Sequence, residues 1–157
     1  MLCRVRSRKL RRGFTTIELV MALVILGAMT AIAVPRFTAL RTQSNVRSAK
    51  AHVAAYLMAT QAGAIRRGTT ATFVTAGGRV WATMVENGAS TTLLTTADIQ
   101  DEYGVTLTSN RPFIQYDMRG VPKTLPATAI IWITAAGKRD SVCVSRAGML
   151  MQRGCTL

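Results

Sequence analysis

Side chains that commonly perform chemistry are scarce in this sequence. Its 157 residues include one histidine, His52, seven acidic residues and three cysteines, and no two cysteines form a Cys-x-x-Cys motif. A zinc site needs clustered Cys, His or carboxylate ligands, and covalent catalysis needs a nucleophile beside a base. The sequence shows neither pattern, and it has no phosphate-binding loop or nucleophile elbow. We therefore predict a protein that is not an enzyme and has no cofactor or metal, with His52 an ordinary surface or boundary residue.

The cysteines indicate a single cross-link. Cys3 lies in a basic N-terminal segment, whereas Cys143 and Cys155 lie close together near the other end of the chain. Such a pair forms a disulfide if the domain leaves the cytoplasm, and otherwise stays as two thiols. The compartment therefore decides between the two states.

Glu18 is the one charged residue in a hydrophobic run of 21 residues from Phe14 to Val34. A helix rises about 1.5 Å per residue, so this run is long enough to cross a hydrocarbon core of about 30 Å. A carboxylate at membrane depth costs a few kcal/mol and usually marks a functional site. We expect Glu18 to have a cationic partner, which its own run does not contain.

The distribution of positive charge gives the run an orientation. The net charge is +13, and six of the 20 Lys and Arg residues fall in the first 13 positions: Arg4, Arg6, Arg8, Lys9, Arg11 and Arg12. Cations before the span keep the N-terminus in the cytoplasm and send the residues after Val34 outward. That side is oxidising, so we expect Cys143 and Cys155 to form a disulfide. The remaining charge of +7 is scattered and suits a soluble surface.

Helical periodicity continues beyond Pro35. Small and apolar residues recur at spacings of three and four, and Arg66 and Arg67 before Gly68 are typical of a helix end. The recurring positions are Val46, Ala49, Val53, Leu57, Thr60 and Ala64. We predict one helix over residues 14–67, with a transmembrane and filament-core part at 14–34 and an amphipathic part at 35–67.

Residues 68–157 form short β-prone runs separated by turn residues. We predict strands at 70–75, 79–86, 104–108, 113–118, 129–134, 141–145 and 149–153, and a helical turn at 97–102. Trp81 and Trp132 are expected to fill the core. The predicted fold class is α+β: a long N-terminal hydrophobic helix followed by a mostly antiparallel β domain.

The residues around the start of the hydrophobic run resemble a known processing site. Arg11-Arg12-Gly13-Phe14-Thr15-Thr16-Ile17-Glu18-Leu19 is similar to the leader-peptidase site of the type IV pilin and pseudopilin family. The likeness has four parts: a short basic leader that ends in glycine, an aromatic residue after it, a glutamate as the fifth residue of the mature chain, and an unbroken hydrophobic run. Pro35 falls where many family members carry a helix-kinking proline.

This resemblance implies a processing and assembly pathway. A prepilin peptidase removes the leader at 1–13 by cutting between Gly13 and Phe14, and its N-methyltransferase activity modifies Phe14. Glu18 then neutralises the N-terminal amine of a neighbouring subunit. The implied partners are other pilin or pseudopilin subunits, the peptidase and the inner-membrane assembly machinery. The protein is expected to cross the inner membrane once, with its C-terminal domain in the periplasm, and then to enter a pilus or pseudopilus.

Residues 49–68 and 131–148 also resemble, more loosely, H-type pseudopilins and related minor pilins. This indicates a minor structural subunit of a type IV pilus or a type II secretion pseudopilus. One alternative is a pilus-tip module that captures extracellular DNA for uptake through phosphate contacts. Gly148 is followed by Met149 and Leu150, however, and not by the glycine-arginine-x-arginine pattern of DNA-binding minor pilins. The cations for this alternative, if turns gather them at one end, are Lys138, Arg139, Arg146 and Arg153.

A second alternative is a soluble secreted protein. An ordinary signal peptidase cuts after small residues, and Ala31-Ile32-Ala33 offers a site after Ala33. Glu18 inside the apolar run, and the length of the run beyond the usual 7 to 15 residues, both disfavour this alternative. A plain uncleaved anchor explains the span but not the Gly-Phe-x-x-x-Glu spacing.

Overall fold

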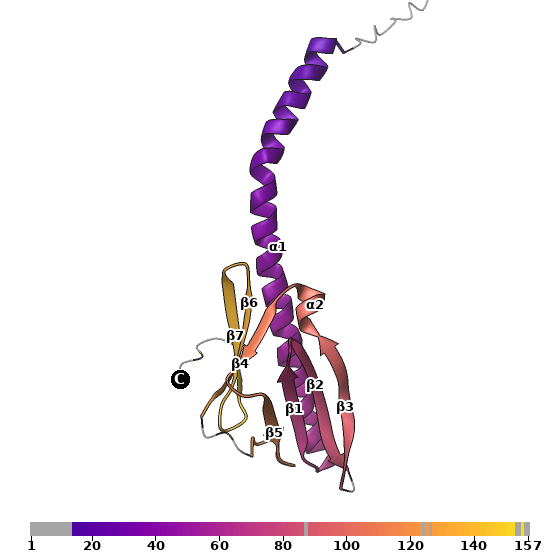
Figure 1. Ribbon diagram of the computed structural model, residues 1–157, viewed down its shortest axis with the longest axis vertical. Helices are drawn as coiled ribbons and strands as arrows, with labels where there is room; N and C mark the ends of the chain where they lie inside the picture. Colours follow the sequence, from indigo (N-terminus) through magenta and orange to yellow (C-terminus); the bar gives the residue numbers. More distant parts are fainter. Residues whose placement is uncertain (1–13, 87, 124, 126, 153–154, 156–157) are drawn as a thin grey trace, which may run out of the picture. The chain divides into compact units, whose positions relative to one another are not determined.

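A single long helix opens the fold, and strands dominate the rest (Figure 1). The computed structural model describes residues 14–86, 88–123, 125, 127–152 and 155, and the side chains of Ile32 and Pro35 lie outside that description. By its internal contacts the chain divides between Ala39 and Leu40 into two units. Helix α1 (Thr16–Arg67) contributes residues to both units, which are described separately below.

The second unit takes its core stripe from the later part of α1. All six positions predicted from the helical periodicity are buried: Val46, Ala49, Val53, Leu57, Thr60 and Ala64. The one polar member is satisfied, because the Thr60 hydroxyl donates to the Tyr56 carbonyl oxygen at 2.6 Å. The helix ends at Arg67, and Gly68 follows with a φ of 62°, the left-handed conformation that glycine adopts most readily. The predicted helix end is therefore confirmed.

Four strands form sheet A, in the order β3-β2-β1-β5. They are β1 (Ala71–Ala76), β2 (Arg79–Glu86), β3 (Ala89–Asp98) and β5 (Phe113–Tyr116), and every pairing is antiparallel. The predicted hairpin at 70–86 is confirmed. Strand β3 was not predicted, because its polar, exposed residues show no alternation of apolar side chains.

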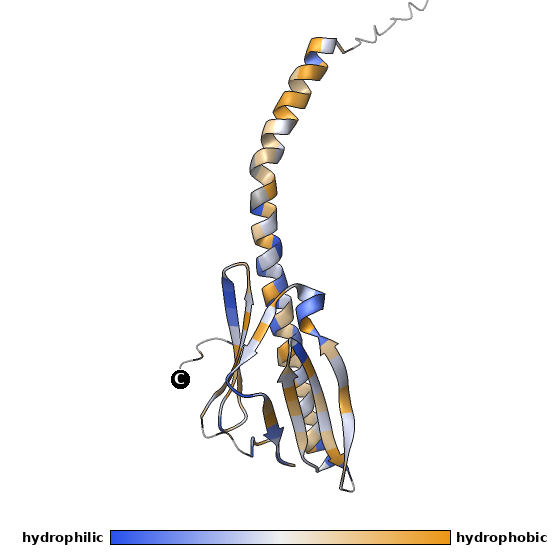
Figure 2. Cartoon of the chain, viewed as in Figure 1, coloured by the Kyte–Doolittle hydropathy of each residue, from blue (hydrophilic) through white to orange (hydrophobic). Residues whose placement is uncertain are grey.

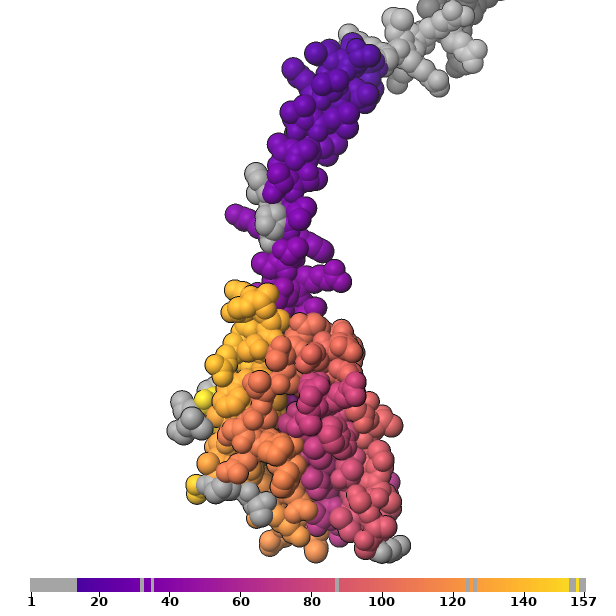
Figure 3. Space-filling model, in the orientation of Figure 1, coloured from indigo at the N-terminus to yellow at the C-terminus, as the bar shows by residue number. Residues whose placement is uncertain are grey.

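Sheet B has the order β4-β6-β7-β8, again with antiparallel pairing throughout. Its strands are β4 (Thr106–Ser109), β6 (Ala129–Ala135), β7 (Lys138–Val144) and β8 (Leu150–Met151). The short helix α2 (Ile99–Tyr103) links the two sheets, and Asp98 caps it by accepting from the Asp101 N–H at 3.1 Å. In Figure 3 the later strands, in orange and yellow, lie on the side of the unit next to β1, β2 and β3, in magenta and salmon.

One core joins the helix to both sheets. Leu57 of α1, Phe73 and Tyr116 of sheet A and Ile133 of sheet B belong to the same buried cluster. The prediction that Trp81 and Trp132 fill this core was wrong, since both are half-buried. In β2 the burial alternates, and Trp81 falls between the buried Val80 and Ala82, on the opposite face of the strand. The α+β fold class is confirmed.

Candidate functional site

The N-terminal end of α1 carries the candidate site, and Thr15 fixes where the helix begins. The Glu18 N–H donates to the Thr15 hydroxyl oxygen at 3.3 Å, and the Leu19 N–H donates to the Thr15 carbonyl oxygen at 3.2 Å. Threonine followed three residues later by glutamate is the sequence signature of a capped helix start. That signal was present in the sequence but was not used in the prediction. The cap places Glu18 in the first turn, where the helix dipole favours a carboxylate.

Glu18 lies on a helix surface that none of the described residues covers. Its apolar neighbours are exposed, with Phe14 at 84%, Ile17 at 64% and Met21 at 62%. The segment is long and apolar enough to cross a membrane, with a mean hydropathy of 2.4 over an 18-residue window in which no residue is buried. Figure 2 shows this part of α1 as mainly hydrophobic. An exposed apolar surface of this extent requires lipid or other helices as its environment.

The polar side chains of this segment differ in whether they find a hydrogen-bond or ion-pair partner within the described part of the chain. The Thr30 hydroxyl donates to the Gly27 carbonyl oxygen of the preceding turn at 2.8 Å, so it needs no outside partner. Glu18 forms no salt bridge within residues 14–86 or elsewhere in the described part of the chain. The carboxylate is thus the group in the segment that calls for a partner from another molecule.

Two further residues of the predicted processing and assembly segment are placed only in part. Gly13 and the leader lie outside the described residues, whereas Phe14 is described and directly precedes the Thr15 cap. Helix α1 continues through Pro35 without interruption. The kink expected at Pro35 therefore stays a prediction.

The predicted disulfide is present. Cys143 of β7 is bonded to Cys155, with their Cα atoms 5.9 Å apart, and Cys143 is fully buried. Hydrogen bonds also join the C-terminal segment and β7 to α1. Lys50 Nζ of α1 donates to the Gln152 carbonyl oxygen and, at 2.7 Å, to Asp140 Oδ1. Sequence reasoning missed this lysine, since its partners lie about 90 to 100 positions away along the chain.

Three of the four cations named for DNA capture are described, and they do not lie at one end of β7. Lys138 and Arg139 begin β7, whereas Arg146 follows the other end of that strand, about 20 Å away at the usual rise per residue. The Arg139 guanidinium lies over the Trp132 ring, 5.1 Å from its centre. Arg153 lies outside the described residues. The described cations therefore do not form the single phosphate-binding cluster that this alternative needs.

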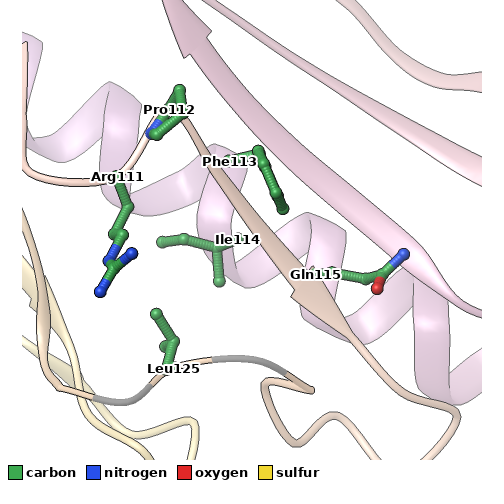
Figure 4. A pocket seen from close by; sticks show the side chains of 6 residues that line it. All are labelled: Arg111, Pro112, Phe113, Ile114, Gln115 and Leu125. Carbon is green, nitrogen blue, oxygen red and sulfur yellow. The ribbon is translucent and has the colours of Figure 1, made fainter.

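The hollow beside β5 shows no catalytic constellation among its lining residues. A cavity of about 320 Å³ lies beside β5, and Arg111, Ile114 and Leu125 point into a common space there (Figure 4). Pro112, Phe113 and Gln115 complete its lining. His52, elsewhere in the unit, has its Nδ1 3.1 Å from the Tyr103 hydroxyl, a contact between α1 and α2. The described residues contain no cluster of metal-binding side chains.

Comparison with known proteins identifies the family. Residues 49–148 match the model of the family described as Type II transport protein GspH. The chain belongs to the GspH family. The fold of this GspH-family chain is similar to that of the type IV minor pilin FimU of Pseudomonas aeruginosa strain PAO1, known from two crystal forms. The P21 form gives a TM-score of 0.60 at 15% identity, covering 71% of this chain and 90% of FimU.

The second crystal form of FimU, in space group P65, gives a TM-score of 0.56 at 15% identity, with 69% and 92% of the two chains covered. At this identity the likeness to FimU concerns the fold alone. No curated protein sequence matches this chain. The match to GspH, a type II secretion pseudopilin, makes the chain a structural subunit of a pilus or pseudopilus and not an enzyme.

The family match and the N-terminal motif are independent of one another. The matched region begins at Ala49, after the exposed apolar segment and well beyond Phe14 and Glu18. A pilin-like chain assembles with other pilin subunits, and the exposed apolar helix fits anchoring in a membrane. Two separate parts of this GspH-family chain therefore lead to the same family.

Proposed function

We propose that this chain is a minor subunit of a type IV pilus or a type II secretion pseudopilus, assembled through its N-terminal helix after processing. A prepilin peptidase cuts between Gly13 and Phe14, and Phe14 becomes the methylated N-terminus. The mature chain crosses the inner membrane once and holds residues 68–157 in the periplasm. From there the inner-membrane machinery moves it into the filament.

The observation that carries this proposal is that Glu18, in the first turn of an exposed apolar helix, has no ion-pair partner among the described residues. A carboxylate and an ammonium are each costly in hydrocarbon, but a pair of them is tolerated far better. Cleavage after Gly13 creates an α-amino group, which is cationic near neutral pH. The amine of one subunit and Glu18 of the next then neutralise each other, and this pairing fixes the register in which helices assemble.

Substitution at Glu18 separates assembly from membrane insertion. Glu18→Ala removes a charge from the span, so the variant should insert at least as well as the wild type. Incorporation into sheared filaments, or co-purification with neighbouring subunits for a tip-located chain, should fall at least roughly tenfold, the effect of losing about 1.4 kcal/mol. Glu18→Gln tests the charge alone and should behave like Glu18→Ala.

Thr30→Ala is the matched control in the same span. It removes a hydroxyl that is already bonded within its own helix, so incorporation should stay at the wild-type level. If Glu18→Ala enters filaments as efficiently as Thr30→Ala, the pairing mechanism is wrong for this chain.

A further inference from the structure

Strand β3 leaves one edge of sheet A open. It is the terminal strand of the sheet and pairs only with β2 among the described strands (Figure 1). Natural edge strands are usually short or carry charges or proline that block pairing with another chain. β3 has ten residues, and positions 89–97 contain no Lys, Arg, Asp, Glu or Pro. Apart from the Thr95 carbonyl oxygen, which accepts from the Tyr56 hydroxyl at 3.1 Å, this edge is therefore available as a template for another strand.

The register shows which backbone groups the edge presents. The Val85 N–H donates to the Thr70 carbonyl oxygen at 3.0 Å, on the side away from β3, so Val85 and its partner Ser90 are a non-hydrogen-bonded pair. Backbone groups alternate in direction along an antiparallel strand. The N–H groups of Ser90 and of Thr92, two residues on, consequently point outward.

A groove runs beside this edge on the helix side. The β2–β3 register shifts between the Thr92 and Leu94 pairings, and such a bulge changes the alternation of side chains. Leu93 and Leu94 accordingly both line one hollow of about 370 Å³. Its other apolar walls come from α1: Ala59, Ala62 and Gly63. A strand added to β3 would direct alternate side chains into this groove.

The end of the groove is cationic. Arg66 and Arg67 line it, and Arg67 Nη1 lies 2.7 Å from Glu86 Oε1. Arg66 is exposed and has no ion-pair partner within the described part of the chain. The unit from Leu40 onward carries thirteen Lys and Arg against six Asp and Glu, a net +7, so a second copy brings a repelling charge. Charge complementarity therefore favours a partner that places a carboxylate beside Arg66.

We propose that the β3 edge and this groove bind an extended, acidic segment of a different subunit of the same filament. The segment adds as a fifth strand to sheet A, inserts small apolar side chains over Ala59 and Ala62, and places a carboxylate against Arg66. This inference rests on the proposed filament role, and it names the kind of partner and the surface that the partner occupies.

Photo-crosslinking of the full-length chain in its own cells tests the surface. Benzoylphenylalanine replaces Thr92 on the β3 edge and, as a control, Thr108 on β4, the corresponding exposed edge of sheet B. The expected result is an adduct from position 92, and none from 108, with one other pilin-like subunit. Mass spectrometry should locate the bond in a segment that contains Asp or Glu.

Groove variants in the same assay test the chemistry of the contact. Ala59→Glu puts a carboxylate where the strand would bury it and should lower the adduct from position 92 at least roughly tenfold. Ala55→Glu makes the same change one turn earlier on α1, at an exposed residue outside the groove lining, and should leave the adduct unchanged. Arg66→Glu should lower the adduct as well.

The outcomes separate this inference from the filament role. An adduct with a second copy of this chain, equal adducts from positions 92 and 108, or an adduct that survives both Ala59→Glu and Arg66→Glu would overturn it. If the chain is in sheared filaments but position 92 gives no adduct, the inference is wrong and the proposed function stands. If the wild-type chain neither enters filaments nor co-purifies with other pilin-like subunits, both are wrong.

Discussion

The two parts of helix α1 present the same kinds of side chain to very different surroundings. Leu23 is 61% exposed and Val24 is 67% exposed, whereas Val53 and Leu57 are at most 1% exposed. The later residues pack against strands of their own chain, while none of the described residues covers the earlier ones. Burial of apolar surface is favourable for both parts of the helix. Only the later part is buried in the folded chain, so only that part stabilises the fold. The apolar surface of the earlier part remains exposed and can contact lipid and other subunits.

The largest expected effect is that substitutions in the two parts of α1 change the free energy of unfolding by different amounts. Leu57→Ala should lower the free energy of unfolding of the second unit by about 2 to 5 kcal/mol, because it leaves a cavity in the core. Leu23→Ala should change it by less than about 0.5 kcal/mol. Tryptophan fluorescence of the full chain in detergent during urea unfolding measures this, since both tryptophans, Trp81 and Trp132, lie in the second unit.

The reverse pattern should hold for assembly. Leu23→Ala removes apolar surface from the uncovered segment and should reduce incorporation into filaments, whereas Leu57→Ala should not, provided that the second unit stays folded. Equal loss of unfolding free energy for the two variants would show that the chain covers its own N-terminal segment.

A somewhat smaller effect on stability is expected from the disulfide in the second unit. The Cys143–Cys155 loop has a sequence separation of 12, and closing a loop of this size is worth about 3 kcal/mol in the chain-entropy model. Reduction should lower the melting temperature of the second unit by roughly 10 to 20 °C. Calorimetry with and without reductant measures this shift. A Cys143→Ser/Cys155→Ser variant should already melt at the lower temperature and should not respond to reductant.

The smallest expected effect is a pH dependence of the free energy of unfolding of the second unit. Asp117 accepts from the Val121 N–H and the Arg119 N–H, each at 2.9 Å, and these backbone donors together with the Arg119 side chain hold the pKa of Asp117 below its usual value. A lowered folded-state pKa gives stability that is present above about pH 4 and is lost as the pH falls through the folded-state pKa.

Asp117→Asn should therefore remove a small part of the acid-dependent loss of stability while leaving helix content in the first unit unchanged. Chemical unfolding between about pH 2 and 6 measures the difference between variant and wild type. An unchanged acid profile in Asp117→Asn would show that the carboxylate is not stabilised in the folded state.

The sequence was sufficient wherever a local pattern decided the structure. The stripe from Val46 to Ala64 follows helical periodicity, and the hairpin at 71–86 follows alternating residues around the Gly77-Gly78 turn, where both glycines have positive φ. The Cys143–Cys155 bond followed from the spacing of two cysteines and from the orientation of the span. In each of these cases the residues that form the sequence pattern lie close together in the chain.

Features that depend on distant pairing escaped prediction. β3 is an exposed edge strand, so its residues need no apolar alternation, and its bulge directs two adjacent leucines into one groove. The Lys50 contacts require α1 and the C-terminal segment to meet in space. The DNA-capture alternative needed turns to gather the cations at 138, 139 and 146 at one end, but Lys138 and Arg139 begin β7 and Arg146 follows its other end.

The mass of the mature N-terminus tests the central claim most directly, since every assembly step depends on the uncovered helix staying on the chain. Chain isolated from membranes of cells that hold an active prepilin peptidase should begin at Phe14 and carry a methyl group on its amine. Replacing Gly13 with Leu should leave the leader attached. A mature chain that begins at Val34 would contradict the account, because the segment with Glu18 would then be discarded before any filament is built.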